Sequence, residues 1–248
     1  MIITAKELEK LLPDTSNLES DEPEMESTLH YEQLALLVAC LEFLWRDRTD
    51  FMICANLTIY FSRQQLKNRD YRGPDFFLIK NTEKRPRKSW VVWEEDGKYP
   101  DLIIELLSSS TEDTDRNLKK QLYQDRFRTP EYFWFSPESL EFMGFRLSGN
   151  QYQEIPLTDE GWRWSDELQL FLGIHDRKLR YFSPEGQLIP TANEVAEQEL
   201  ERAEQEQQRA DQERQRAEQE RQRADQERQR ADQLAERLRS LGINPDEL

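Results

Sequence analysis

The stretch that decides the fold is residues 99–120, "YPDLIIELLSSSTEDTDRNLKK". Its pattern predicts a short apolar strand opened by Pro-Asp, then a polar turn, then a helix that carries a double lysine. Glu105 stands inside the apolar run, between Ile104 and Leu106. A buried acid is costly unless it has a hydrogen-bonding partner or a cation. The stretch therefore predicts an α/β fold and a carboxylate that needs partners.

The chain up to residue 192 alternates between helical and strand-like patterns. Apolar residues at helical spacing predict a helix over 28–48, and a polar helix is expected over 112–127. Pro, Ser and Gly-Asn turn signals separate the expected strands. These are "FMICANLTIYF", "DFFLIK", "SWVVWEE", "DLIIELL", "EYFWF", "LEFMGFRL" and "QYQEIPL", with "WRWSDELQLFLGIHDRKLRYF" closing the domain. We expect an α/β domain over 1–192, with a mixed sheet flanked by helices and a helix after the central strand.

Residues 193–248 form a second expected domain, a long charged helix built on a seven-residue repeat. Alanine recurs once per repeat, at 203, 210, 217, 224 and 231, and Glu follows three residues later until Leu234. A coiled coil needs two apolar positions per heptad, and these repeats offer one small one. The tail is therefore expected to be coiled-coil-like in pattern but weakly pairing, and to add little to the core.

Composition limits the class of protein. The 248 residues contain two cysteines, Cys40 and Cys54, both in apolar runs, which favours buried thiols in a reducing compartment. No apolar run is long enough to span a bilayer, and the start "MIITAKELEKLLPDT" is an expected amphipathic helix rather than a signal peptide. These features predict a cytoplasmic protein without a membrane segment.

The net charge of −16 opposes general binding to polyanions, but the charge is uneven. Residues 1–30 hold 8 acids against 2 lysines, whereas residues 60–98 hold 10 bases against 6 acids. The densest basic cluster is "KRPRK" at 84–88. Such a cluster is compatible with contacts to a phosphate backbone, although a solvated loop is the more ordinary interpretation, and we favour it.

Two Pro-Asp dipeptides each open a strand, at Asp75 and Asp101. Alternation along a strand puts Asp101 and Glu105 on one face, but more than ~12 Å apart at ~3.3 Å per residue. A hairpin between "DFFLIK" and "DLIIELL" would instead bring Asp75 beside Glu105. We expect their carboxylates roughly 3–6 Å apart, so that both can bind one Mg²⁺ ion. Two carboxylates, a cation and a nearby lysine suit the hydrolysis of a phosphodiester.

An acid opening one strand and a second acid in the next resembles the PD-(D/E)XK nuclease superfamily. The surrounding motifs resemble its Uma2 (Uma-two) family of restriction endonucleases, which is often found in cyanobacteria. The resemblance covers about residues 20–190 and excludes the tail. It rests on "GPDFFLIK", "PDLIIELLSSST", the helical spacing of Asp115, Lys119 and Tyr123, and "EYFWFSP".

This resemblance implies a restriction-endonuclease-like fold and an endonuclease that hydrolyses DNA with Mg²⁺ or Mn²⁺. Asp75 and Glu105 would be both catalytic and metal-binding, and Lys119 would be the catalytic lysine. In the superfamily the lysine stands two residues after the second acid, where this chain has Leu107; the resemblance implies that the helix supplies it. Ser136 stands where relatives have Asp. By analogy with the superfamily a homodimer is also plausible.

An ideal α-helical wheel separates the two neighbouring lysines. At ~100° per residue from Asp115, Lys119 falls at ~40° and borders a stripe formed by Leu118 and Leu122, which we expect to be buried. Lys120 falls a further ~100° away and is expected to point to solvent. Replacing Lys120 should therefore have little effect.

Glu26 and His30 stand four residues apart where the first long helix begins. The resemblance makes Glu26 a third candidate metal ligand, although an acid at a helix N-terminus is also favoured by the helix dipole. His30 is expected to be a hydrogen-bonded structural residue. His175 falls in a turn and receives no role.

Two other functions are compatible with the sequence. The first is a catalytically silent nuclease fold that acts as a binding or assembly module and docks a protein partner through its helical tail. The acidity of the chain would suit that alternative. The second is a metal-dependent hydrolase of a small phosphodiester, for which the sequence offers no substrate-pocket motif.

Overall fold

The structure is a computed structural model, and it describes residues 18–20, 27–62, 73–108 and 114–240. The chain divides after Ala192 into two compact units. The first unit contains every β-strand, and the second consists of helix.

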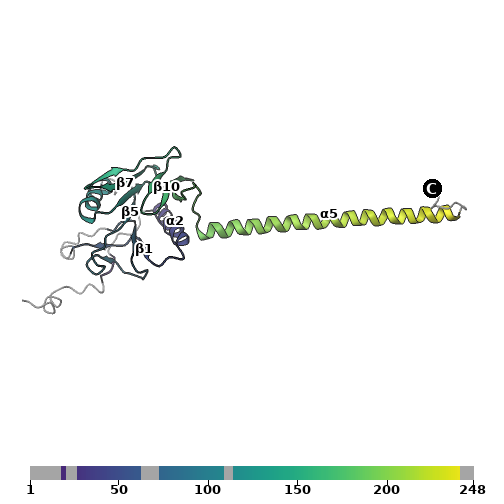
Figure 1. The fold of residues 1–248 in the computed structure, drawn as a ribbon, viewed down its shortest axis with the longest axis horizontal. Coiled ribbons are helices and arrows are strands. Elements are labelled where there is room, and N and C mark those ends of the chain that lie inside the picture. Colours follow the sequence, from purple (N-terminus) through teal and green to yellow (C-terminus); the bar gives the residue numbers. More distant parts are fainter. Residues whose placement is uncertain (1–17, 21–26, 63–72, 109–113, 241–248) are drawn as a thin grey trace, which may run out of the picture. The chain divides into compact units, whose positions relative to one another are not determined.

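The centre of the first unit is a six-stranded mixed sheet with the order β1-β3-β5-β6-β7-β8 (Figure 1). Four of its five strand pairs are antiparallel, and β5 and β6 are parallel. Parallel neighbours need a crossover connection, which here is the predicted helix after the central strand. The α/β fold class with a mixed sheet is confirmed. The strands are β1 (Phe51–Ala55), β3 (Phe76–Lys80), β5 (Leu102–Leu106), β6 (Glu131–Phe135), β7 (Phe142–Ser148) and β8 (Gln151–Glu154).

Both faces of this sheet are covered, and each cover forms a hydrophobic core. On one face lie helix α2 (Thr28–Leu44) and a three-stranded antiparallel sheet, which pack against side chains such as Leu102 and Ile104 of β5. The other face packs against the crossover and against the two-stranded parallel pair of β2 (Ile59–Tyr60) and β4 (Trp90–Val91). The three-stranded sheet consists of β9 (Arg163–Ser165), β10 (Leu170–His175) and β11 (Lys178–Phe182).

Several expected elements are shorter in the structure than in the sequence pattern. The helix expected over 28–48 ends at Leu44. The run "FMICANLTIYF" is broken at Asn56, whose φ of 45° lies in the left-handed region that asparagine tolerates. In "SWVVWEE" only Trp90 and Val91 are strand, because the chain then turns. The hydrophobic pattern predicted where strands occur and overestimated how far they run.

The crossover is not a regular α-helix. It consists of π-helix over η1 (Thr114–Lys119), one short α-helical turn, α4 (Lys120–Leu122), and π-helix again over η2 (Tyr123–Phe127). A π-helix hydrogen-bonds from i to i+5, so side chains turn by less per residue than in an α-helix. The predicted buried stripe is therefore wrong for Leu118, which is 61% exposed, whereas Leu122 is partly buried against the core and Tyr123 and Phe127 form the buried face.

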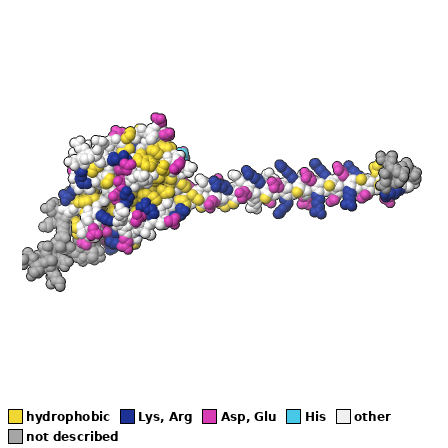
Figure 2. Space-filling model, in the orientation of Figure 1, with side chains coloured by type: hydrophobic (Ala, Val, Ile, Leu, Met, Phe, Trp, Pro, Cys, Tyr) yellow, Lys and Arg dark blue, Asp and Glu magenta, His cyan; other side chains and the backbone are white. Residues whose placement is uncertain are grey.

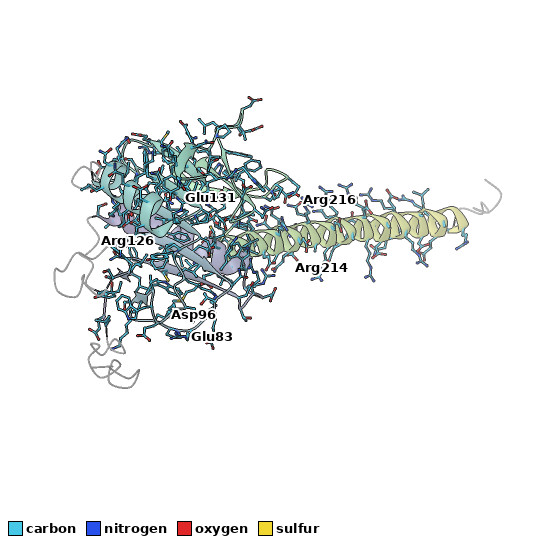
Figure 3. All side chains as sticks on the ribbon, turned by 60° about the vertical axis from the view of Figure 1, so that its left-hand side comes forward. Glu83, Asp96, Arg126, Glu131, Arg214 and Arg216 are labelled. Atoms are coloured by element: carbon cyan, nitrogen blue, oxygen red, sulfur yellow. The ribbon has the colours of Figure 1, made fainter. Side chains whose placement is uncertain are left out.

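Glu131, at the start of β6, joins the central sheet to the three-stranded sheet (Figure 3). Its carboxylate accepts hydrogen bonds from the guanidinium of Arg146, the hydroxyl of Ser165, and the backbone N–H groups of Asp166 and Glu167. Glu131 is 1% exposed, so these donors replace the water that it loses. The contact connects two layers whose residues lie far apart in sequence.

The second unit is a single helix, α5 (Ala192–Ser240), of 49 residues. At 1.5 Å per residue it is roughly 70 Å long. Nearly all of its side chains are exposed, and arginine and acidic side chains alternate along it (Figure 2). Arg214 and Arg216 extend away from the helix in Figure 3. The predicted long C-terminal helix is confirmed, and its described side chains form no apolar face of any size.

Candidate active site

Asp75 and Glu105 lie opposite each other at one end of the antiparallel pair of β3 and β5. The register pairs Phe76 with Ile104, so the residues one step further along each strand are Asp75 and Glu105. The backbone N–H of Asp75 donates to Oε2 of Glu105 at 3.3 Å. Oδ2 of Asp75 accepts from the backbone N–H of Leu106 at 2.7 Å. The predicted antiparallel pairing therefore brings the two acids together, although β4 lies between β3 and β5 in the chain, so the pair is not a simple hairpin.

Glu105 has no exposed surface. It shares the crossover-facing side of β5 with Ile103 and Leu107, whose side chains belong to that core. Its carboxylate is satisfied by donors from the crossover. Nζ of Lys119 lies 3.1 Å from Oε2, and the phenol of Tyr123 donates to Oε1 at 2.7 Å. The mid-strand acid thus has the partners that its burial requires.

The crossover places Lys119 beside Glu105, which is the position expected of the lysine supplied by the helix. Its side chain is 16% exposed, so the ammonium lies in a partly buried site where its charge is only weakly screened. Tyr123 is a functional candidate to which the sequence alone assigned no role. Its spacing of four residues from Lys119 was the available signal, and the phenol contact with Glu105 could not be read from that spacing.

Burial is the main cause that raises the pKa of Glu105, to about 7. The positive charge of Lys119 acts in the opposite direction, the nearby charge of Asp75 raises the pKa further, and the hydrogen bonds from Tyr123 and Lys119 lower it. The influence of Asp75 means that the two acids repel each other when both are ionised. Close carboxylates of this kind favour a shared cation.

The donor set fits a magnesium-type ion. Mg²⁺ is usually held by one or two carboxylates, with water and substrate phosphate completing its coordination. Asp75 and Glu105 supply two carboxylates, and the described residues contain no cluster of three or more His, Cys, Asp or Glu side chains that could form a closed metal cage. The third candidate ligand, Glu26, lies outside the described residues.

Asp101, the other Pro-Asp acid, lies at the opposite end of the β3–β5 pair. Its Oδ2 accepts from the backbone N–H of Lys80 at 2.6 Å, where β3 ends. Burial raises the pKa of Asp101, and the bond from Lys80 acts against that shift. The two similar dipeptides therefore have different surroundings: Asp75 faces Glu105, and Asp101 closes the far end of the strands.

The comparison with known families settles the relationship that the motifs suggested. The profile of the Uma2 family, described as "Putative restriction endonuclease", matches residues 17–180. The chain belongs to the Uma2 family. No curated protein matches it. A solved structure, described as a "putative nuclease belonging to DUF820 from Anabaena variabilis ATCC 29413", aligns with 15% identity and a TM-score of 0.44, over 67% of this chain and 91% of that one.

Two other predicted positions of this Uma2 chain have structural contacts. His30 is buried and bridges two elements, with Nδ1 2.8 Å from Oγ of Ser27 and Nε2 3.2 Å from the carbonyl oxygen of Leu107. This confirms the expectation of a hydrogen-bonded structural histidine. Ser136 accepts a hydrogen bond from the backbone N–H of Ser139 in the turn after β6. Its contacts are those of a turn residue.

Lys120 does not point freely to solvent, and that prediction is wrong. Its ammonium lies 3.4 Å from the ring centroid of Phe145 and 5.5 Å from that of Trp134. The side chain is partly buried over β6 and β7. The ideal α-helical wheel failed here because π-helix precedes Lys120 and follows Leu122.

The basic cluster 84–88 is occupied by internal ion pairs. Lys84 pairs with Glu42, Lys88 with Glu19, and Arg85 and Arg87 both with Glu95. The cluster follows β3 at the end away from Asp75. Its charges are thus largely neutralised, which supports the solvated-loop interpretation. Both cysteines are buried thiols outside any disulfide, as expected, and burial raises the pKa of Cys54 to about 12. No helix in the described part of the chain has the length and apolarity to cross a bilayer.

Proposed function

We propose that this Uma2 chain is a metal-dependent endonuclease that hydrolyses phosphodiester bonds in DNA. The observation that carries the proposal is the convergence of two acids and a lysine at one end of β3 and β5. Lys119 lies 3.1 Å from Glu105, and Asp75 lies opposite Glu105 across the strand pair. The family description, restriction endonuclease, supports DNA as the substrate.

In this proposal Asp75 and Glu105 hold Mg²⁺ or Mn²⁺. When bound, the ion would stabilise negative charge on the phosphate and lower the pKa of a coordinated water. The ammonium of Lys119, held 3.1 Å from Oε2 of Glu105, can orient the attacking water or a phosphate oxygen. Tyr123 holds one oxygen of Glu105, which fixes the carboxylate while its other oxygen faces Lys119.

Local charge supports DNA binding although the whole chain is acidic. Residues 114–128 contain five basic residues and two acids. The chain's acidic excess is concentrated elsewhere: residues 1–30 hold 8 acids and 2 lysines, and residues 193–248 hold 16 acids and 10 arginines. Arg116 in this segment is paired with Glu141, so the local attraction for phosphate comes mainly from the other basic side chains. It acts at short range, because more distant charges are screened within about 10 Å at 0.1 M salt.

The test is nicking of a supercoiled plasmid with Mg²⁺ or Mn²⁺. Wild-type protein should nick the plasmid in a metal-dependent reaction, and Asp75→Asn should lose at least about a hundredfold in rate. Asp101→Asn is the matched control, since it alters the same dipeptide at the far end of the strands and should retain activity. If wild-type protein shows no metal-dependent nicking, or Asp75→Asn nicks as well as wild type, the proposal is rejected.

A further inference from the structure

The ammonium of Lys120 lies over two aromatic rings beside the candidate site. One side of its ammonium contacts the rings of Phe145 and Trp134, at 3.4 and 5.5 Å from their centroids. An ammonium has three N–H donors. No hydrogen bond or ion pair to any described residue uses them. The rings therefore hold the charge in place without occupying its donors.

The first of these rings, Trp134, lies on the strand next to Glu105. In the parallel register of β5 and β6, Glu105 is the partner of Trp134. Strands in a sheet are about 4.8 Å apart, so a cation above β6 and β7 stands roughly 5–10 Å from the carboxylate on β5. Lys119 and Lys120 are adjacent in sequence and contact neighbouring strands. The ammonium of Lys119 contacts Glu105 on β5, and that of Lys120 lies over Trp134 on β6 and Phe145 on β7.

Arg116, another basic side chain of the crossover, already has a protein partner. Arg116 makes two hydrogen bonds to the carboxylate of Glu141, at 2.7 and 2.6 Å. Burial lowers the pKa of Lys120, whereas the charge of Glu154 acts in the opposite direction. The ammonium is thus partly desolvated and lacks a direct counter-ion among the described residues, which are the conditions under which an anion is bound well.

We propose that Lys120 binds a phosphate of the DNA strand next to the phosphate that is cleaved. The proposal rests on the function proposed above, since it assumes a DNA backbone running past Glu105. Phe145 and Trp134 restrict the lysine side chain, so less conformational entropy is lost when the phosphate binds. A backbone contact of this kind strengthens binding without selecting a base sequence.

The competing explanation is that Lys120 only stabilises the sheet through its cation–π contact. The two explanations differ in their salt dependence, because each phosphate contact releases counterions and contributes about 0.9 to the slope of log K against log salt. Lys120→Gln removes the charge, and Lys120→Arg restores a cation that also stacks on aromatic rings. A purely structural contact would change stability and leave the salt slope alone.

Lys84 provides a matched control. Its ammonium also lies over an aromatic ring, 4.6 Å from the centroid of Phe51, but it is paired with Glu42 and follows β3 at the end away from Asp75. Lys84→Gln therefore removes a ring-stacked lysine without touching the site. It should leave DNA affinity and its salt slope unchanged.

The experiment measures binding of the full chain to a fluorescent DNA duplex in Ca²⁺, from 50 to 200 mM salt, together with thermal midpoints. Lys120→Gln should weaken binding on the order of fivefold at 50 mM and reduce the salt slope by about 0.9, and Lys120→Arg should restore both. An unchanged slope with a lower midpoint would overturn the proposal in favour of the structural explanation. Failure of wild-type protein to bind the duplex would overturn the proposed function as well, so the two failures are distinguishable.

Discussion

The phenol of Tyr123 donates a 2.7 Å hydrogen bond to Oε1 of Glu105, a carboxylate with no exposed surface. Tyr123 is itself fully buried, so no water can replace its hydroxyl without rearrangement. The bond links the crossover to the central strand at the candidate site. It makes Tyr123 a positioning residue for Glu105.

Tyr123→Phe should destabilise the protein by about 1–3 kcal/mol, because one oxygen of a buried carboxylate loses its donor. Urea unfolding at pH 8 measures the loss. The control is Tyr181→Phe: the Tyr181 hydroxyl is also buried but has no hydrogen-bond partner among the described residues. Its removal should be neutral or stabilising, and equal effects of the two changes would show that the phenol bond to Glu105 is unimportant.

Glu105 should make stability depend on pH in a defined direction. Burial, as the main cause, raises its pKa in the folded protein from an ordinary value of 4.5 to about 7, so the folded state retains a proton that the unfolded state has released. This contribution is fully present below pH 4.5 and is lost as the pH rises through 7. Relative to Glu105→Gln without divalent metal, the unfolding free energy of wild-type protein should fall by about 3 kcal/mol across that range. A difference between the two proteins that is independent of pH would contradict the raised pKa.

Glu131→Ala should destabilise the first unit by about 3–5 kcal/mol. The substitution leaves the buried partners of the carboxylate, among them Ser165 and part of the Arg146 guanidinium, without an acceptor. Glu138→Ala is the control, since that side chain is exposed in the turn after β6. Chemical unfolding of both variants measures the difference, and a loss below about 1 kcal/mol for Glu131→Ala would mean that water replaces the carboxylate at little cost.

Deletion of residues 193–248 should leave the thermal midpoint of the first unit nearly unchanged. The described side chains of α5 are almost all exposed, so the deletion removes little buried apolar area. Differential scanning calorimetry of the full and shortened chains makes the comparison. A loss of several degrees in the shortened chain would mean that the tail packs on the domain or holds a dimer together.

The sequence predicted the parts of the site that depend on strand alternation and pairing. Glu105 is recognisable because a mid-strand acid needs partners, and its pairing with Asp75 follows from two neighbouring strands of the sheet that are each preceded by Pro-Asp. The crossover was harder to predict, since the sequence pattern does not distinguish i→i+5 from i→i+4 hydrogen bonding. The sequence still places Lys119 close to Glu105, as the structure has it. The π-helical geometry is the reason that the predicted surroundings of Leu118 and Lys120 are wrong.

The contacts of Tyr123 and Lys120 depend on tertiary structure. Each joins the crossover to residues that only the folded sheet brings near: Glu105 for Tyr123, and Phe145 for Lys120. The internal pairing of the 84–88 cluster also depends on the fold, since Glu42 stands 42 residues before Lys84. Charge counts along the chain therefore overestimated the basic surface that is available to a polyanion.

The most direct test of the central claim is the single-turnover rate of plasmid cleavage by Lys119→Met, measured at saturating Mg²⁺ and DNA. Loss of a correctly placed cation from a transition-state site lowers rates by about 10²–10³. The account predicts a loss of that size at a temperature where the variant is fully folded, with Mn²⁺ binding retained; the thermal midpoint itself should fall, because buried Glu105 loses its charged partner. A Lys119→Met rate equal to the wild-type rate would contradict the assignment of Asp75, Glu105 and Lys119 as one catalytic site.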